Sequence, residues 1–424
     1  MPAISPAISP AHLLLMAIVL ASILLMLVRP RGIAEVWWIG GGAVLLVALR
    51  LVPLRLAGHA IAEGTDVYLF LTGMMLLSEL ARYFGVFDWV ASLAAEHSHG
   101  SDVRLFTLIY AVGTVVTIFM SNDATAVVLT PAVLSAVRRS RAEPLPHLFA
   151  CAMIANAASF VLPISNPANL VVYRGHMPPL AHWMAAFGVP SALSIAVTYL
   201  VLRWIFRRDL RSAVPDHREH PEFTPAGKFV LAGIFVTAGV LLAASALGKD
   251  LGLPTCVSAL IVATVVTIAA RTNPVRIARD IAWSVLPLVA GLFVLVEAME
   301  QVGAMQLAAR LLIRAEQLPA GAGAFLAAAV VGVGNNLVNN LPLGLIAGST
   351  LRLMNAHGLV AHAVLIAVDL GPNLSVTGSL ATILWLIALR REGVHVGFGS
   401  FLRVGAIAMP LALAAAIAGA VLLR

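Results

Sequence analysis

The chain has 424 residues, of which 60% are hydrophobic and 11% carry a charge, and its formal net charge is +7 at pH 7. Soluble domains average roughly 45–50% apolar and about 25% charged residues, so an ordinary soluble interior could not bury this chain. Its basic residues lie in short segments between apolar runs, a pattern that reflects membrane topology rather than nucleic-acid binding. The composition therefore predicts a multi-pass membrane protein without a nucleic-acid partner.

Apolar runs of helical length recur along the whole chain. Backbone groups in lipid must be hydrogen-bonded within their own segment, and a helix needs roughly 20 apolar residues to cross the hydrocarbon core. The predicted spans are residues 11–28, 35–54, 66–83, 104–120, 122–137, 147–161, 182–206, 228–247, 255–270, 281–300, 322–338, 341–354, 361–370, 374–389 and 401–423. Several are too short to cross alone, which predicts an all-α polytopic protein with broken helices and re-entrant hairpins.

The sequence carries no signature of an enzyme or of a resident cofactor. It contains no G-x-x-x-x-G-K-[ST] phosphate-binding loop, so the energy for any transport would have to come from an ion gradient or a separate subunit. Cys151 and Cys256 lie far apart in apolar segments, and the histidines lack metal-ligand spacing, so we expect no metal site. The apolar run at residues 12–28 is not preceded by positive charge, and we interpret it as a retained first helix rather than a signal peptide.

An internal repeat divides the chain around the polar stretch 207–228. LTGMMLLSELARYFGVF at 71–87 aligns with VAGLFVLVEAMEQVGAM at 289–305, which pairs Gly73, Glu79 and Gly85 with Gly291, Glu297 and Gly303. With the register shifted by one residue, Ser121, Asn122 and Asp123 fall on Val338, Asn339 and Asn340, and after a further gap Asn169 falls on Asn373. Repeats of this kind predict that each half contributes to one shared site, as in many secondary transporters.

The repeat and the charge distribution give a domain plan. We expect N-terminal helices in 1–64, a first inverted repeat in 65–206, a cytoplasmic linker in 207–228, connecting helices in 229–280, and a second inverted repeat with a C-terminal helix in 281–424. By the positive-inside rule the cytoplasmic loops are those with Arg29 and Arg31, Arg138, Arg139 and Arg141, the 203–228 stretch, Arg271, Arg276 and Arg279, and Arg390, Arg391 and Arg403. The loop before the first repeat is neutral and the loop before the second is basic, which fits halves of opposite topology.

The segment SNDATAVVLTP at 121–131 contains the first candidate site residues, Asn122, Asp123 and Thr125. A carboxylate within the membrane is costly unless it is paired, hydrated or protonated, so Asp123 is a functional-site hypothesis. Ser121 or Asn122 could also cap the next helix and aim its N–H groups at a ligand. The alternative is that Asp123 itself is only an N-cap in an interfacial turn.

The matching segment VGVGNNLVNNLP at 331–342 contains four amides in an apolar stretch, Asn335, Asn336, Asn339 and Asn340. Buried amides are expensive without partners. From this segment we assign Asn339 and Asn340 to the solute site. Because Asn340 stands opposite Asp123 in the predicted register, the site would hold one titratable carboxylate and one amide.

Two further segments break apolar runs with Pro and small polar residues, LPISNPANL at 162–170 and VDLGPNLSVTGS at 368–379. We read them as unwound helix breaks. They add the candidate solute ligands Ser165, Asn166 and Asn169 from one half and Asn373, Ser375 and Thr377 from the other. A bond from each hydroxyl to its own preceding turn is the alternative. Asp369 is a second buried carboxylate, and we assign proton coupling to Asp123 and Asp369.

Glu79 and Glu297 match across the repeat but lie on long predicted helices. A partner from another helix or a hydrated vestibule would suffice to explain them.

Three segments resemble the arsenical pump membrane proteins, the ArsB family of the ion transporter superfamily. They are SNDATAVVLTPAVL (121–134), LPISNPANLVVY (162–173) and DLGPNLSVTGSLATILWLIALRREG (369–393). The resemblance implies inverted repeats with a site between broken helices, in the inner membrane of the cell. It also implies export of arsenite and antimonite, as trivalent hydroxides, in exchange for protons. A soluble ATPase is a further partner that the family sometimes uses, and transport does not depend on cysteine thiols.

Relatives in the same superfamily define the alternatives. Sodium/proton antiporters and anion or dicarboxylate transporters share the architecture, and the dicarboxylate branch typically has Ser-Asn-Thr in both halves. Here the corresponding positions read Ser165-Asn166-Pro167 and Gly371-Pro372-Asn373, and neither break contains Arg or Lys. This pattern argues against dicarboxylates and only weakly against sodium.

Overall fold

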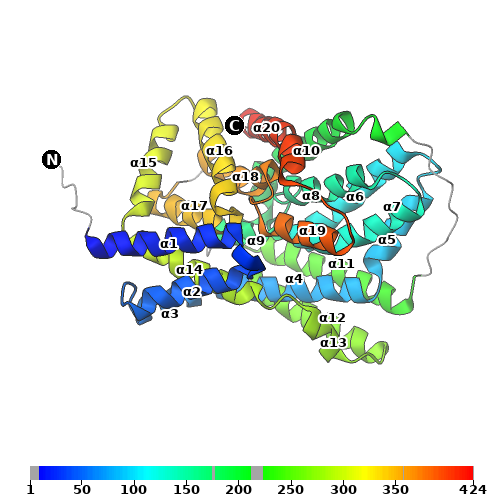
Figure 1. Ribbon diagram of the computed structural model, residues 1–424, viewed down its shortest axis with the longest axis horizontal. Coiled ribbons are helices and arrows are strands. Elements are labelled where there is room, and N and C mark those ends of the chain that lie inside the picture. The colour runs from blue at the N-terminus through cyan, green and yellow to red at the C-terminus, as the bar shows by residue number, and fades with distance from the viewer. Residues whose placement is uncertain (1–8, 174–176, 212–222, 357, 424) are drawn as a thin grey trace.

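The computed structural model describes residues 9–173, 177–211, 223–356 and 358–423, and every regular element within them is a helix (Figure 1). Seven of the described helices are long and apolar enough to cross a membrane, or up to nine if each of two bent pairs counts as one span. The protein is therefore an all-α multi-pass membrane protein, as the hydropathy pattern predicts.

Two groups of α-helices lie outside the two repeats. The N-terminal group is α1 (Pro10–Val28), α2 (Glu35–Ala48) and α3 (Leu54–Glu63), and the connecting group is α11 (Pro225–Ala246), α12 (Gly252–Ala269) and α13 (Pro274–Asp280). Short 3-10 turns lie at Pro30–Gly32 and Asp209–Arg211. Two turns mark where α1 ends and α11 begins: Arg29 closes α1 with a left-handed backbone (φ 48°), and Thr224 caps α11.

The first repeat runs from α4 to α10 and the second from α14 to α20. The first contains α4 (Thr65–Tyr83), α5 (Val86–Glu96), α6 (Asp102–Met120), a π-helical segment (Ala124–Leu129), α7 (Thr130–Arg139), α8 (Pro144–Ala157), a 3-10 turn (Pro163–Ser165), α9 (Pro167–Val172) and α10 (Leu180–Ile205). The second contains α14 (Val285–Gln301), α15 (Ala304–Glu316), α16 (Ala320–Val338), α17 (Asn340–Met354), α18 (Leu359–Leu370), a 3-10 turn (Gly371–Leu374), α19 (Leu380–Arg391) and α20 (Phe398–Leu422).

The two repeats share their element order in detail. Gly85 and Gly303, which the sequence pairs, both adopt positive φ (71° and 79°) and begin the equivalent helices α5 and α15. Left-handed backbone is nearly free only for glycine, so the same turn recurs for the same reason. Pro190 and Pro410 each lie inside the long last helix of a repeat, and these helices, α10 and α20, pack against each other. The predicted two-repeat fold class with broken helices is confirmed.

The structure corrects several predicted boundaries. Helices α5 and α15 are absent from the predicted spans. Each has one apolar face and one charged face, so neither forms a continuous apolar run. The span 35–54 ends earlier, at Ala48, and α3 follows it as a separate helix. Residues 225–228 of the predicted linker form the first turn of α11, whereas 212–222 lie outside the described residues. The linker's cytoplasmic position stays a prediction.

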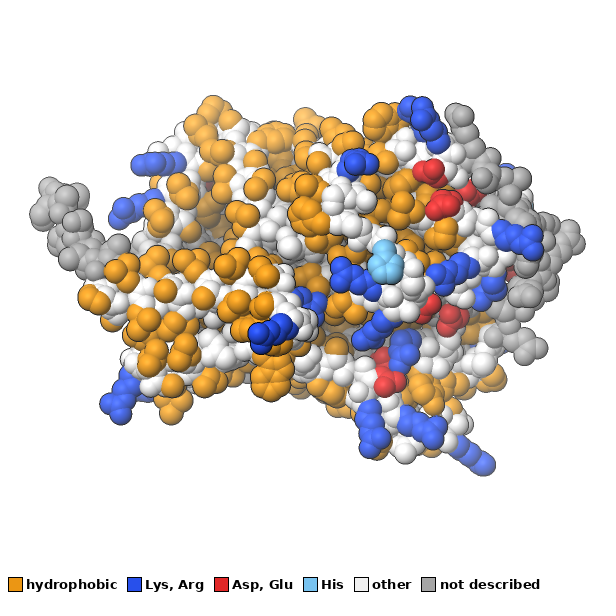
Figure 2. Space-filling view, in the orientation of Figure 1, with side chains coloured by type: hydrophobic (Ala, Val, Ile, Leu, Met, Phe, Trp, Pro, Cys, Tyr) orange, Lys and Arg blue, Asp and Glu red, His pale blue; other side chains and the backbone are white. Residues whose placement is uncertain are grey.

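Burial separates the broken helices from the full spans. Nearly every residue of α8 and α18 is buried, while only about a third of α11 and α12 is covered by protein. Figure 2 shows hydrophobic side chains over much of one face, notably along α1, and charged side chains gathered toward the side where α5, α7, α13 and α19 lie. The short helices with irregular backbone therefore form the centre, as membrane burial requires of unpaired backbone groups.

Candidate functional site

Each repeat contains a hairpin whose tip has an unusual backbone. Helix α6 ends at Ser121 (φ 105°, ψ 160°) and α16 ends at Asn339 (φ 76°, ψ 154°). This region is essentially restricted to glycine, and a residue with a side chain there costs of order 1–3 kcal/mol, so such sites cluster where function requires them. The next residues, Asn122 and Asn340, stand at equivalent positions immediately after the two tips.

The tips correct the predicted register. The spacing between Ser121 and Asn339 equals that between Gly85 and Gly303, so no one-residue shift occurs between the two blocks. Asn122 therefore pairs with Asn340, and the counterpart of Asp123 is Leu341 rather than Asn340. The second half has an apolar residue where the first has its carboxylate, which makes the site more asymmetric than predicted.

A small inner cavity lies between the halves. It measures about 20 Å³, and its polar lining consists of Asn122, Asp123, Asn166 and Asn340, together with the apolar residues Leu71, Pro167, Val285, Leu341, Leu380 and Ala381. A cavity needs roughly 10–15 Å³ to hold a water molecule, so this one has room for one. The side-chain oxygen of Asn122 is buried and has no hydrogen-bond partner within the described residues. Such a group requires a ligand or a water molecule to satisfy it.

Asp369 is linked to this cavity through one side chain. It is fully buried near the end of α18, and its Oδ1 accepts a hydrogen bond of 2.8 Å from Nδ2 of Asn166. Asn166 also caps α9 by accepting from the backbone N–H of Ala168 at 3.0 Å. The two carboxylates assigned to proton coupling thus both lie at the inner cavity, Asp123 in its wall and Asp369 one hydrogen bond behind it.

Other predicted ligands hold the broken backbone together. Asn169 donates to the carbonyl oxygens of Ser159 (2.9 Å) and Leu162 (3.3 Å) in the break after α8, and the latter also accepts the backbone N–H of Ser165 at 3.0 Å. The Ser165 hydroxyl donates to the Ile118 carbonyl at 3.0 Å, and Thr125 is hydrogen-bonded to Thr117 at 2.8 Å. The side chains of Asn169, Ser165 and Thr125 are fully buried and do not line the inner cavity; their hydrogen bonds hold the segments around it in place.

In the second half the hydroxyls bind an amide of the hairpin. The Ser375 hydroxyl donates to Oδ1 of Asn336 at 2.8 Å, and the Thr377 hydroxyl donates to the Asn336 carbonyl at 2.8 Å. Asn339 donates to the Thr377 carbonyl at 3.3 Å. The hairpin tip and the break between α18 and α19 therefore form one hydrogen-bonded unit.

Asn373 joins the two repeats. Its Oδ1 accepts from Asn156 at 2.9 Å, and its Nδ2 donates to the Met153 carbonyl at 2.9 Å. Asn156 and Asn335 are polar residues without a predicted role. Asn335 donates to the carbonyls of Ala367 and Val368 at 2.7 and 3.1 Å. The signal that could have identified them is the need of each helix break for side-chain donors.

Three neighbouring cavities, which share lining residues, lie in order from the inner cavity outward. The inner cavity shares Asp123, Leu71 and Pro167 with a chamber of about 130 Å³. The chamber in turn shares Glu79 and Asp280 with a vestibule of about 670 Å³. Arg391, which the positive-inside rule places on the cytoplasmic side, lines the vestibule. The inner cavity is therefore approached from the end of the molecule predicted to face the cytoplasm.

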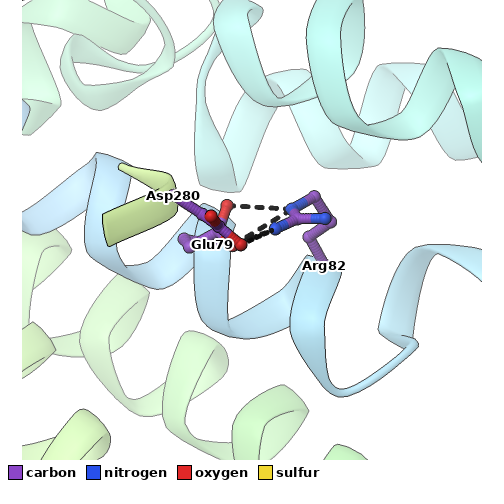
Figure 3. Close-up of polar contacts among 3 residues, drawn as sticks. All are labelled: Glu79, Arg82 and Asp280. Carbon is purple, nitrogen blue, oxygen red and sulfur yellow. Dashed lines mark hydrogen bonds and ion pairs between the residues drawn. The ribbon is translucent and has the colours of Figure 1, made fainter. Parts of the chain in front are cut away.

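Glu79 stands where the chamber meets the vestibule. Its carboxylate is bonded to the guanidinium of Arg82, one turn later on α4, and Arg82 also contacts Asp280 at 2.8 Å (Figure 3). The partner of Glu79 thus comes first from its own helix and then, through Arg82, from α13. The direct partner is therefore on the same helix and not on another one, and Glu79 also lines the vestibule, whose hydration stays a prediction.

Comparison with known proteins agrees with this architecture. Residues 7–371 match the family described as CitMHS, citrate transporter. The putative arsenical pump membrane protein of Bacillus subtilis strain 168 is 25% identical over 414 residues, which cover 90% of this chain and 93% of that protein. The arsenical pump membrane protein of Escherichia coli K12 is 26% identical, with 92% and 94% covered. The resemblance carried by the three motifs is confirmed.

A solved structure supports the fold. The crystal structure of the Alcanivorax borkumensis YdaH transporter, described as having an unusual topology, superposes with a TM-score of 0.58 over 98% of both chains at 14% sequence identity. At this identity the likeness shows the fold alone.

Proposed function

The chain belongs to the citrate transporter family and is a multi-pass membrane transporter, and from that premise we propose that it exports arsenite and antimonite across the cytoplasmic membrane in exchange for protons. The arsenical pump proteins to which it is similar along nearly its whole length support this substrate over citrate. We propose that the site residues predicted from the sequence act in solute binding and proton coupling, from the positions described above.

The observation that carries the proposal is the lining of the inner cavity. Three amides and one carboxylate supply its polar groups, and no Lys or Arg stands among its lining residues. Citrate would meet no cation there, and a buried charge without a partner is costly. A neutral trihydroxide of arsenic or antimony can instead donate to and accept from Asn122, Asn166 and Asn340.

Asp123 is the proposed site of proton exchange. It lies in the wall that separates the inner cavity from the chamber, so a proton and a solute hydroxyl compete for the same carboxylate. Asp369 holds Asn166 from behind and is the second proton-coupling residue in the proposal. Proton arrival from outside would displace the solute, and solute arrival from the cytoplasm would displace the proton.

The size of the cavity places a condition on this exchange. Space for a single water molecule cannot accept a trihydroxide, so the hairpin tips must separate to admit the solute. Alternating access then consists of opening toward the vestibule, occlusion between the tips, and opening on the opposite side.

Coordination of sodium, the alternative substrate, is less well supported. Sodium would require free carbonyl oxygens at the helix breaks. Carbonyls of Ser159, Leu162, Ala367, Val368 and Gly371 already accept hydrogen bonds from asparagine side chains.

The proposal includes a soluble ATPase as an energising partner on the cytoplasmic side. Metalloid resistance of cells that express this chain with and without such a subunit tests it.

Transport into everted vesicles tests the proposal. An imposed acid interior should drive arsenite and antimonite uptake by vesicles containing the wild-type chain, and Asp123→Asn should abolish the dependence on the pH difference. Asp88→Asn is the matched control, because Asp88 lines only the vestibule. Uptake by Asp123→Asn vesicles that still follows the imposed pH difference, with Asp369 intact, would remove Asp123 from the proton pathway.

A further inference from the structure

Arg82 binds two carboxylates at the mouth of the chamber, and both lie on the same side of its guanidinium (Figure 3). Its Nε donates to Glu79 Oε2 at 2.9 Å, and its Nη2 contacts both Glu79 and Asp280, the latter at 2.8 Å. The Glu79 side chain is only 9% exposed, whereas that of Asp280 is 56% exposed. The guanidinium is thus paired with one buried and one accessible carboxylate, from α4 and α13, and the Arg82 side chain is itself 47% exposed.

The charges along the route are mostly negative. The charged residues that line the chamber are Glu79, Asp123 and Asp280, with no Lys or Arg among its lining residues. The vestibule has two basic lining residues, Arg82 and Arg391, against four acidic ones, Glu79, Asp88, Asp280 and Glu392. A solute that moves inward therefore passes from a mixed surface to an acidic one.

A clamped arginine behaves differently from a free one. The guanidinium fork is the side chain best suited to bidentate binding of carboxylates. Glu79 and Asp280 bind its Nε and Nη2, whereas Nη1 takes part in none of these bonds. One positive and two negative charges sum to −1 for the three side chains, so the two carboxylates outweigh the guanidinium and repel an incoming anion at short range. Discrimination between solutes is achieved by such repulsive elements as well as by attractive contacts.

We propose that Glu79 and Asp280 mask the charge of Arg82 and so make the route to Asp123 reject polyanions. The masked arginine would then determine specificity within a family described as citrate transporters. The proposal rests on the proposed function and deepens it, because it limits the substrate class to neutral or cationic solutes. Glu79 provides the buried part of the mask and Asp280 the part that can be removed without disturbing the core.

The test compares four chains: the wild type, Asp280→Asn, the double variant Glu79→Gln with Asp280→Asn, and the control Asp88→Asn. Citrate binding to each purified protein is measured by its shift of the melting temperature, and citrate inhibition of arsenite uptake is measured in vesicles. We expect no citrate effect on the wild type or on Asp88→Asn, and an apparent affinity for citrate at least about tenfold higher in the unmasked chains.

Each outcome decides between masking and its absence. Equal citrate binding by the wild type and the double variant would overturn the proposal, and so would a citrate effect in Asp88→Asn as large as in Asp280→Asn. If the double variant does not fold, Asp280→Asn carries the test alone, since its side chain is exposed. Failure of the wild type to transport arsenite would refute the proposed function, while the binding measurement would still decide the masking.

Discussion

Two asparagines on either side of the second hairpin tip should respond in opposite ways to the same substitution. Asn335 is fully buried and donates to the carbonyls of Ala367 and Val368, where α18 ends. Asn340 lines the inner cavity, and its side chain makes no hydrogen bond within the described residues, while its backbone N–H donates to Gly378 at 2.9 Å. We therefore expect Asn335→Leu to lower stability and Asn340→Leu to lower transport.

The expected magnitudes follow from the contacts. The Val368 carbonyl would lose its Asn335 donor, at about 1–3 kcal/mol, whereas the Ala367 carbonyl keeps the Gly371 N–H and loses one bond worth about 0.5–1.5 kcal/mol. Asn335→Leu should therefore cost roughly 2–4 kcal/mol. Unfolding entropies of about 2.1 cal/mol/K per residue, applied to 424 residues, convert this into a fall in melting temperature of about 2–5 °C. Asn340→Leu removes no intramolecular side-chain bond, so its melting temperature should stay within about 1 °C. Its arsenite transport should fall roughly tenfold, because one solute hydrogen bond is lost and the cavity is narrowed.

Both variants are purified in the same detergent for thermal unfolding and assayed in everted vesicles at matched protein levels. Each serves as the control for the other, since the same residue types are exchanged on neighbouring helices. A fall in melting temperature for Asn340→Leu equal to that for Asn335→Leu would make Asn340 a scaffold residue. An unchanged melting temperature for Asn335→Leu would refute the role given to amide donors at the helix breaks.

Other substitutions test the surroundings of the site. A Cβ added at Gly405 would lie 2.2 Å from the Asn373 carbonyl oxygen and 2.4 Å from that of Leu374, so Gly405→Ala should lower both the melting temperature and transport. Gly399→Ala on the same helix, with nothing within 4 Å of the added carbon, should change neither, and equal effects of the two would show that α20 does not shape the break. Cysteines at Asn122 and Asn340, in a chain without Cys151 and Cys256, should stop transport when cross-linked and restore it on reduction. Transport that continues in the cross-linked chain would contradict the required separation of the tips.

Much of the architecture was predictable because membrane burial leaves a strong pattern. Long apolar runs and the polar interruptions at Asn122, Asn166 and Asn373 correctly indicated where helices break, since Pro and amides are costly in lipid-facing spans. Helices α5 and α15 were missed because their mixed faces resemble loops in a hydropathy window. Glycine at the left-handed turns before them was conspicuous in the sequence, but a turn does not reveal the helix that follows it.

The details of the site were harder to infer. The sequence favoured pairing Asp123 with Asn340 because the Asn-Asp and Asn-Asn pairs look alike. The structure aligns the tips by backbone conformation instead, and side-chain chemistry does not encode that. Which amides face the cavity and which hold carbonyls depends on distances between segments more than 200 residues apart, such as Asn156 and Asn373. Nor could the clamp on Arg82 be predicted, because Asp280 reaches it from a different helix.

The hydrogen bonds that cross between the repeats have a mechanical consequence. Asn166 holds Asp369 and Asn156 holds Asn373, so the broken segments α8–α9 and α18–α19 are fastened together at their unwound centres. Neither can slide past the other without exposing fully buried amides and a carboxyl group, and each such loss costs kilocalories. The pair therefore forms a rigid hub. The hinge of the conformational change must therefore lie around the hub, where the hairpin tips contact it. A tight inhibitor would bind there and prevent the tips from moving.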